Sequence, residues 1–527
     1  MHRKHRIPFL LLVSAAVLLT SCSLFPEIDI SPRIFADPGE EILSSEGEKE
    51  GEVDAGEGGG GSRIDRQQAA LLPQADVDLQ RLTGIPYYQI SGEIFPEESR
   101  FSGQMTLFYT NQEVIPLTVL NFRLFPNGGK SYGDGSLTVG NLAVNGQPVE
   151  SDLSVADSVL TAVLPDELPP GNTIEITADF QGEIPRDFGG GYGLYNQADG
   201  VISLSGWFPL LAVYDDQGWN LDPVSAIGDS VYSDAAFFEV TVTVPEDAVV
   251  IATGEQAAQE EISPGRKQIR YLSGPARDFY LILSSDFQRV VRQAGETEIN
   301  SYFLSEDQQA ANLAAEIAAD SVEIFNHYYG LYPYTELDVV AAPMRYAAGI
   351  EFPGVILVGR QYYQQYQDTF FAIVTAHEVA HQWWYNVVGS DVIDEPWMDE
   401  ALVTFSSNLY FEEEISQGMY DQLIDYYRRV VEQSNAADSG ALITDSLEAF
   451  EATPERRSLY SPIVYSKGAL FYAELREKIG DEAFFSALQG YYADNLFGIG
   501  TPEELLGWFE TASGEELDAF YQLWLYR

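Results

Sequence analysis

Hydrophobic and polar positions alternate along much of the chain between residues 81 and 295. In the run 238–244, apolar residues at even positions are separated by Glu and Thr, the period of two that is typical of a half-buried strand. An Asn145-Gly146 pair between two short runs predicts a tight hairpin turn. Further strand-like runs lie at 103–109, 117–125, 173–180 and 279–283. The region predicts an N-terminal all-β domain.

Beyond about residue 296 the pattern changes to helical periods. An Ala-rich amphipathic helix, two or three strands and a long apolar helix are expected at 308–329, 336–357 and 369–386. The chain after Pro396 is almost entirely helical in pattern, and Thr501-Pro-Glu-Glu is a typical helix start. The second domain, residues 296–527, is therefore expected to be α+β and mostly helical.

The first 22 residues predict an export signal, with a basic start followed by an apolar run at 7–19 that is short for a membrane span. The run ends in Leu19-Thr20-Ser21-Cys22, which resembles the bacterial lipobox, and Cys22 is the single cysteine of the chain. The resemblance implies a lipid-anchored protein that faces outside the cytoplasm. The alternative is an ordinary cleaved signal or a short anchor.

Composition changes two parts of this picture. Residues 23–80 are rich in Glu, Gly and Ser, which predicts a flexible acidic tether. The whole chain has 28 basic and 81 acidic residues, a formal charge of −53, so nucleic acid is not an expected partner. At 45% hydrophobic residues, the rest of the chain can form real cores.

The strongest chemical signal is His377-Glu378-Val-Ala-His381 within the predicted apolar helix. Residues i and i+4 share a helix face, so both imidazoles can bind one metal ion, with Glu378 beside the open coordination position. Such a motif can arise by chance as a surface feature. Here its neighbours are apolar, and a buried unpaired imidazole pair is costly whereas a metal-bound pair is not. His327, the remaining histidine beyond the signal, is expected to be a packing or surface residue.

A zinc ion held by two histidines needs a third protein ligand, and a carboxylate on the next helix can provide it. Glu400 lies in the first turn of the helix expected after Pro396. Taken alone, an acidic residue there is more typical of a solvated helix start.

The spacing from His377-Glu378-x-x-His381 to Glu400, in Trp-Met-Asp-Glu, resembles the signature of the gluzincin M1 family of zinc aminopeptidases. The resemblance implies one Zn²⁺ per chain, bound by His377, His381 and Glu400, in a thermolysin-like catalytic domain. It assigns Tyr465, in Tyr-Ser-Pro-Ile-Val-Tyr-Ser-Lys-Gly, as the donor that stabilises the oxyanion.

The resemblance also matches residues 348–352, Ala-Gly-Ile-Glu-Phe, to a family segment that binds the free amine of the substrate. Gly349 and Glu351 are the retained substrate-binding residues, whereas the other three positions differ. Glu351 is expected to bind the substrate ammonium; the alternative is a structural ion pair with Arg345. The family's second ammonium-binding residue, from the β domain, has no evident match.

These residues predict a peptidase in which Glu378 accepts a proton from the attacking water, and peptides are the expected partners. Removal of N-terminal residues is the expected activity. An endopeptidase or other zinc hydrolase on the same scaffold, and an inactive surface-binding lipoprotein, are the alternatives. Because the sequence stops at Arg527, without the large helical domain of many relatives, a more open cleft is expected.

Overall fold

The computed structural model describes residues 63–75, 77–82, 84–188, 191–434, 436 and 439–527. The predicted signal, Cys22 and the tether up to residue 62 lie outside these residues. Within the described ranges, no helix is both long enough and apolar enough to cross a bilayer.

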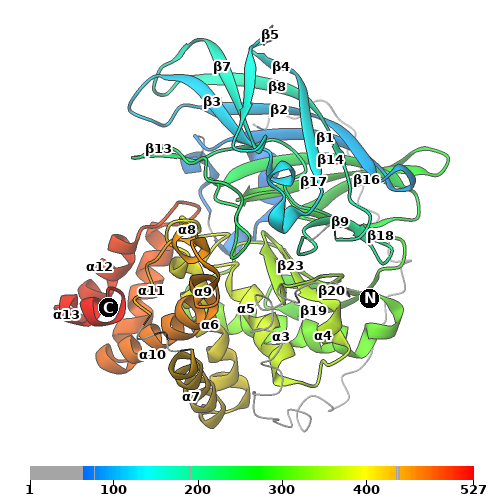
Figure 1. The fold of residues 1–527 in the computed structure, drawn as a ribbon. Helices are drawn as coiled ribbons and strands as arrows, with labels where there is room; N and C mark the ends of the chain where they lie inside the picture. Colours follow the sequence, from blue (N-terminus) through cyan, green and yellow to red (C-terminus); the bar gives the residue numbers. More distant parts are fainter. Residues whose placement is uncertain (1–62, 76, 83, 189–190, 435, 437–438) are drawn as a thin grey trace, which may run out of the picture.

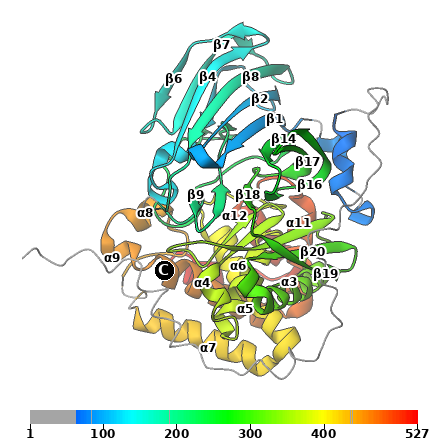
Figure 2. The same ribbon diagram turned by 90° about the vertical axis from the view of Figure 1, so that its right-hand side faces the viewer.

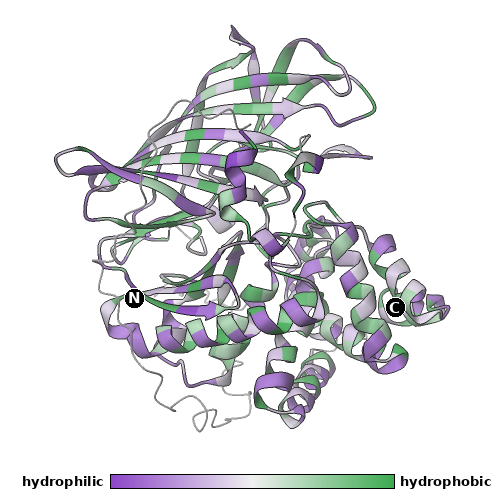
Figure 3. Cartoon of the chain, turned by 180° about the vertical axis from the view of Figure 1, so that it is seen from behind, coloured by the Kyte–Doolittle hydropathy of each residue, from purple (hydrophilic) through white to green (hydrophobic). Residues whose placement is uncertain are grey.

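The N-terminal half is built from β-sheets, which lie above the helical half in Figure 1. The main sheet has eight strands, in the order β16 (Glu255–Ser263), β17 (Arg266–Ala276), β14 (Ala236–Pro245), β1 (Tyr87–Phe95), β2 (Arg100–Thr110), β8 (Thr173–Glu183), β4 (Ser136–Val144) and β5 (Gln147–Pro148). The predicted Asn145-Gly146 turn joins β4 to β5, and both residues have positive φ, 48° and 75°. The alternation of hydrophobic and hydrophilic residues along the long strands is visible in Figure 3.

Smaller sheets complete this half. One contains β15 (Val249–Ala252), β18 (Leu281–Ser284), β10 (Val201–Leu204) and β9 (Tyr195–Ala198). Another contains β11 (Leu210–Leu211), β3 (Leu117–Arg123), β7 (Val159–Leu168) and β6 (Ser151–Ser154), and β12 (Tyr214–Asp215) pairs with β13 (Gly218–Trp219). The strand-like runs of the sequence all fall within strands, apart from one- to two-residue differences at their ends.

The second half combines one mixed sheet with many helices. Its sheet order is β19 (Gln288–Ala294), β20 (Thr297–Phe303), β21 (Glu336–Ala342), β23 (Val355–Gly359) and β22 (Gly349–Phe352). Because β19 pairs with β20, this sheet begins before the predicted boundary at residue 296. An all-β domain followed by a mostly helical α+β domain is the predicted fold class, and it is confirmed.

Helices pack against and beyond this sheet, as Figures 1 and 2 show. They are α3 (Gln308–Tyr328), α4 (Arg360–Tyr363), α5 (Thr369–Ala380), α6 (Trp397–Tyr410), α7 (Gln417–Gln433), α8 (Leu447–Glu451), α9 (Pro454–Arg457), α10 (Gly468–Ile479), α11 (Asp481–Asp494), α12 (Pro502–Ser513) and α13 (Asp518–Trp524). Two π-helical segments, η9 (Phe411–Ile415) and η11 (Ser461–Lys467), interrupt the helical part. Thr501 forms the expected capping box with Glu504.

Residues 63–82 pack on the protein, which differs from the predicted tether that runs to residue 80. They form short 3₁₀ turns, η2 (Asp65–Ala70), η3 (Pro73–Ala75) and η4 (Leu79–Leu82). Leu71 is buried, and the backbone N–H of Leu72 donates to the carbonyl of Pro333. Burial of apolar side chains therefore holds this part of the predicted tether on the protein.

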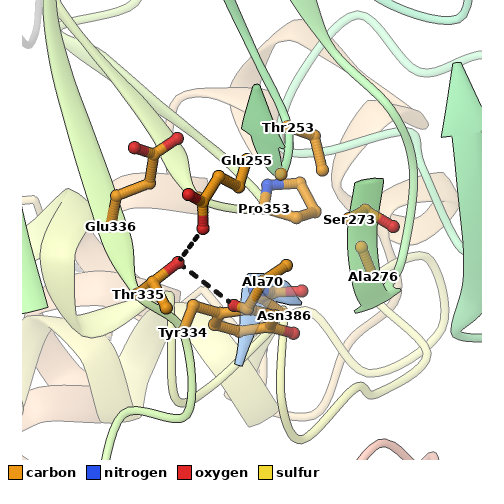
Figure 4. A pocket seen from close by; sticks show the side chains of 12 residues that line it. Ala70, Thr253, Glu255, Ser273, Ala276, Tyr334, Thr335, Glu336, Pro353 and Asn386 are labelled. Atoms are coloured by element: carbon orange, nitrogen blue, oxygen red, sulfur yellow. Dashed lines mark hydrogen bonds between the residues drawn. The ribbon is translucent and has the colours of Figure 1, made fainter. Parts of the chain in front are cut away.

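A small polar cavity of about 10 Å³ lies where this segment meets both halves (Figure 4). Thr335 donates to Glu255 there, at 2.9 Å. The volume suits roughly one water molecule and not a peptide.

The two halves are held together around Arg277, which is buried. Its guanidinium donates to the carbonyls of Tyr385, Asn386 and Val387 at 3.1–3.2 Å. These carbonyls follow α5, which ends at Ala380, where the sequence predicted a helix to residue 386. The backbone N–H groups of Asn386, Val387 and Val388 donate to carbonyls five residues earlier, so the chain there no longer follows the α-helical pattern.

A second contact between the halves is an aromatic stack. The rings of Tyr280 and Phe352 lie 3.7 Å apart, centroid to centroid, and are parallel within 2°. Both belong to a small apolar core that joins β18 to β22 and β23. The stack fixes β22, which borders the site described below, on the β-domain.

Asp278, next to Arg277 in the chain, is a buried acidic residue at this junction. Both its carboxyl oxygens are buried without a hydrogen-bond partner, and burial raises its pKa to about 7. In the unfolded chain the pKa of an aspartate is ~3.9. Because folding raises this pKa, the protonated carboxyl of Asp278 contributes its full stabilisation of the native state below that pH. This stabilisation is lost as pH rises to about 7.

We therefore expect Asp278→Asn to raise Tm by roughly 2–4 °C at pH 8 and by less at pH 5, measured by thermal unfolding. Exposed Asp166→Asn serves as the control and should show no such pH dependence. An equal shift of Tm for Asp278→Asn at both pH values would contradict the assignment.

Candidate metal centre and active site

The last turn of α5 brings the two histidines of the motif together. His377 lies in this turn and His381 caps it, with its backbone N–H donating to the carbonyl of His377 at 3.3 Å. The two ring centroids are 4.9 Å apart. The i, i+4 spacing therefore brings the two rings together as predicted, even though α5 ends before the predicted residue 386.

Glu400 completes a three-residue cluster from the first turn of the buried helix α6. Its Oε2 lies 3.2 Å from Nε2 of His377 and 3.6 Å from Nε2 of His381. His381 Nδ1 faces the carbonyl of Trp384 at 3.3 Å, which leaves Nε2 directed at Glu400. The three ligand atoms all lie within 4.8 Å of one another. Two imidazoles and one carboxylate are a donor set that fits zinc and leaves a position open.

The protonation preferences of these groups also suit a cation. Burial lowers the pKa of His381, which favours the neutral ring that a metal requires. Burial alone would raise the pKa of Glu400, but hydrogen bonds with His377 and His381 lower it below its usual range. Glu400 is therefore ionised and is not the solvated helix-start charge of the alternative, because it is 4% exposed.

Glu378 lies beside this cluster with one oxygen free to act. Its Oε2 is buried and has no hydrogen-bond partner. Burial, followed by the charges of Glu400 and Asp229, raises its pKa well above the usual range. A Cβ placed on Gly349 would lie 2.2 Å from Glu378 Oε1, so the space that Glu378 occupies depends on that glycine.

Tyr465 reaches the cluster from the π-helical segment η11. Its hydroxyl donates to Glu400 Oε1, and its ring stacks on that of His377 with centroids 5.9 Å apart. The segment can approach α6 closely because Gly468 faces Ala401, where a Cβ would lie 2.3 Å from the alanine Cβ. Burial, then Glu400, raises the pKa of Tyr465, so its phenol remains protonated and can donate.

Alternate side chains of strand β22 point to the site and to the apolar core. Glu351 is buried and lies with Glu378 and His381 in a second group whose ligand atoms are within 4.8 Å of one another. Ile350 and Phe352, on the other face, belong to the core that joins the two halves. Two of the three positions that differ from the family segment therefore face away from the site.

The alternative partner of Glu351 is contradicted. Arg345 is exposed, pairs with Asp187 at 3.3 Å and lies over the ring of Phe188. His327 also lies outside the cluster and is exposed, with its ring against that of Tyr328, as expected for a packing or surface residue.

Sequence reasoning missed Asp229. This half-buried residue lies in the connection between β13 and β14, and burial, followed by the charge of nearby Glu400, raises the pKa of its carboxyl to about 8. The connection is held against the helical half, since the backbone N–H of Ala226 donates to Glu451 at 2.9 Å. One acid among 81 in a segment without a periodic pattern gives no signal in a single sequence.

Comparison with known proteins agrees with this site. Residues 313–524 match the peptidase family M1 domain, and this match includes all the proposed zinc ligands. The matched region agrees with the resemblance to the M1 family that the sequence motifs predicted.

Two of the similar proteins illustrate the match, and both are named as aminopeptidases. Aminopeptidase M1-C of Oryza sativa subsp. japonica is 25% identical over 390 residues, which are 72% of this chain and 43% of the relative. Aminopeptidase 2 of Candida albicans is 20% identical over 467 residues, 83% of this chain and 46% of the relative. The chain thus spans less than half the length of these relatives.

Solved structures show the same fold. The M1 zinc metallopeptidase of Deinococcus radiodurans superposes with a TM-score of 0.61 at 20% identity, over 84% of this chain and 92% of the other. A mutant of that protein bound to a Tyr-Ser-Ala substrate gives a TM-score of 0.61 at 21% identity, over 84% and 93% of the two chains.

We expect His381→Gln to weaken zinc binding by more than about 100-fold, because a lost ligand costs more than the ~10–100-fold of a lost outer-shell partner. Zinc content after dialysis is the measurement. His327→Gln, which changes a histidine away from the cluster, should keep its zinc. Equal zinc content in the two variants would exclude the cluster as the metal site.

Proposed function

We propose that the protein is a zinc aminopeptidase that removes N-terminal residues from peptides. One observation carries this proposal most directly: His377, His381, Glu400, Glu378 and Tyr465 converge from three separate segments on one site, with Glu351 beside it. The M1 family and its aminopeptidase relatives support it. An inactive binding protein is disfavoured because every proposed catalytic group is present and in contact.

The residues that would hold zinc are His377, His381 and Glu400. When bound, zinc supplies a Lewis acid that acidifies water and polarises a peptide carbonyl. Glu378 accepts the proton of the attacking water at its unpartnered Oε2 and passes it to the leaving amine. Tyr465, a protonated donor, stabilises the negative charge that develops on the carbonyl oxygen.

Asp229 and Glu351 are the proposed receptors of the substrate ammonium. Both carboxyls lie beside Glu378 or Glu400, and no Lys or Arg side chain pairs with either of them in the described ranges. A free N-terminal amine would supply the missing positive charge. Asp229 comes from the β-domain, so both domains would contribute to recognition of the peptide end.

For its location, we propose export and lipid attachment at Cys22, so that the enzyme acts on peptides outside the cytoplasm. Support comes from the sequence Leu19-Thr20-Ser21-Cys22 and from the absence of any other cysteine. Metabolic labelling with a fatty acid measures this directly: Cys22→Ser should lose the label, and label retained by that variant would exclude the anchor.

We expect Glu378→Gln to lower kcat by roughly 10²–10⁴-fold while leaving zinc bound, because it removes the proton acceptor and no ligand. Hydrolysis of aminoacyl chromogenic substrates, together with metal content, measures this. Gly349→Ala should also lower kcat, since its Cβ would displace Glu378. Gly507→Ala, which adds a Cβ where no atom lies within 4 Å, is the matched control. Full activity of Glu378→Gln would remove this residue from the mechanism.

We expect the wild-type protein to cleave free-amine peptides and to leave their N-acetylated forms intact. Glu351→Gln and Asp229→Asn should each lower kcat/KM for free-amine peptides by roughly 10–100-fold, the value of a hydrogen bond to a charged group. Glu93→Gln, on the distant main sheet, should have no effect. Equal cleavage of acetylated and free peptides would instead favour the endopeptidase alternative.

A further inference from the structure

Gln382, the residue that directly follows the second histidine of the motif, is fully buried. Its side-chain amide reaches the hairpin that β22 forms with β23. The Nε2 of Gln382 donates to the carbonyl of Phe352 at 3.1 Å, and its Oε1 accepts from the backbone N–H of Gly354 at 2.9 Å. One side chain at the end of α5 thus binds two of the four residues that make the hairpin turn.

The turn of this hairpin is not one that closes two strands well by itself. Phe352 pairs with Val355, so Pro353 and Gly354 are the two turn residues. Proline fixes its φ at about −65°, and Gly354 has a φ of 72°, a combination found in type II turns. Two-residue hairpins favour the mirror-image turns, because type II turns splay the flanking strands. The end of the hairpin therefore depends on contacts from outside it.

Strand β22 also lies at the edge of its sheet, next to β23. Its end at Phe352 is held from two directions. The ring of Phe352 stacks on Tyr280 of the β-domain, and its carbonyl accepts from Gln382 of the helical half. Glu351, the preceding residue, lies with two side chains of the α5 motif in one group of ligand atoms. The place of Glu351 relative to α5 therefore follows from these two contacts.

We propose that Gln382 is a positioning residue that holds β22 on the zinc-ligand helix, so that Glu351 is in place to receive the amine of a peptide. The inference rests on the proposed function, which assigns the amine to Glu351. Without Gln382, the N–H of Gly354 and the second bond of the Phe352 carbonyl are lost in a buried place, and the hairpin moves away from α5 to regain water. This movement withdraws Glu351, whereas α5 and α6 keep the metal ligands together.

The kinetic test uses Gln382→Met, which keeps the length of the side chain and removes both hydrogen bonds. KM for free-amine aminoacyl substrates should rise by about tenfold or more, while kcat changes by less than about threefold, because binding of the amine is lost and not the chemistry. Zinc content should equal that of the wild-type protein. Gln67→Met is the matched control, since Gln67 is also fully buried and bonds to Tyr87 and Gly274 of the β-domain. Its KM should be that of the wild-type protein.

A double variant shows whether the effect passes through Glu351. In the Glu351→Gln background, Gln382→Met should raise KM by less than about twofold, since the carboxylate that it positions is already gone. A merely structural role would raise KM by the same factor in both backgrounds. Such additivity overturns the inference, and so does a wild-type KM in Gln382→Met.

Hydrogen exchange of the full-length protein, followed by mass spectrometry, separates this inference from the proposed function. The backbone amides of the hairpin, residues 349–359, should exchange faster in Gln382→Met than in the wild-type protein, and Gln67→Met should leave their exchange unchanged. Unchanged exchange of the hairpin in Gln382→Met overturns the inference. If the wild-type protein does not cleave free-amine substrates, the proposed function is overturned, and the exchange rates still decide whether Gln382 holds the hairpin.

Discussion

The burial of several carboxylates in one place is the constraint on which the site depends. Glu351, Glu378 and Glu400 are each less than 10% exposed, and Asp229 joins them from the β-domain. Ionised carboxylates at such depth are costly unless cations or hydrogen-bond donors balance them. Two imidazoles and one phenol contact Glu400. Among the described residues, no Lys or Arg forms an ion pair with the carboxylates of the site. Under the proposed function, the site receives this positive charge from outside, as metal and as the amine of a peptide.

This arrangement requires both domains to be held in a fixed relation. Arg277 binds the carbonyls that follow α5, and the Tyr280–Phe352 stack fixes β22, so the β-domain contacts the strand and helix that border the site. The same junction carries the connection that contains Asp229. Under the proposed function, a change in the junction would alter substrate recognition without changing a metal ligand.

The sequence predicted those parts of the site that lie close together along the chain. His377, Glu378 and His381 follow from helical geometry, and the family resemblance added Glu400, Tyr465, Glu351 and Gly349, all of which the structure brings together. The alternation of strands and the helix caps likewise follow from local chemistry. The parts of the fold and site that could not be predicted depend on contacts between residues that are far apart in the sequence. Arg277 binds the segment that follows α5 from more than 100 residues away, and the connection that contains Asp229 packs on the helical half. Phe352 departs from the family segment because it faces the junction core, a fact visible only once β22 and β18 are placed side by side.

If these buried acidic and imidazole groups form a zinc centre, anomalous scattering at the zinc edge will locate the ion between them. A crystal of the protein equilibrated with one equivalent of zinc should give a single anomalous peak bounded by His377, His381 and Glu400. A peak elsewhere on the acidic surface, with none between these three side chains, would exclude them as the zinc centre.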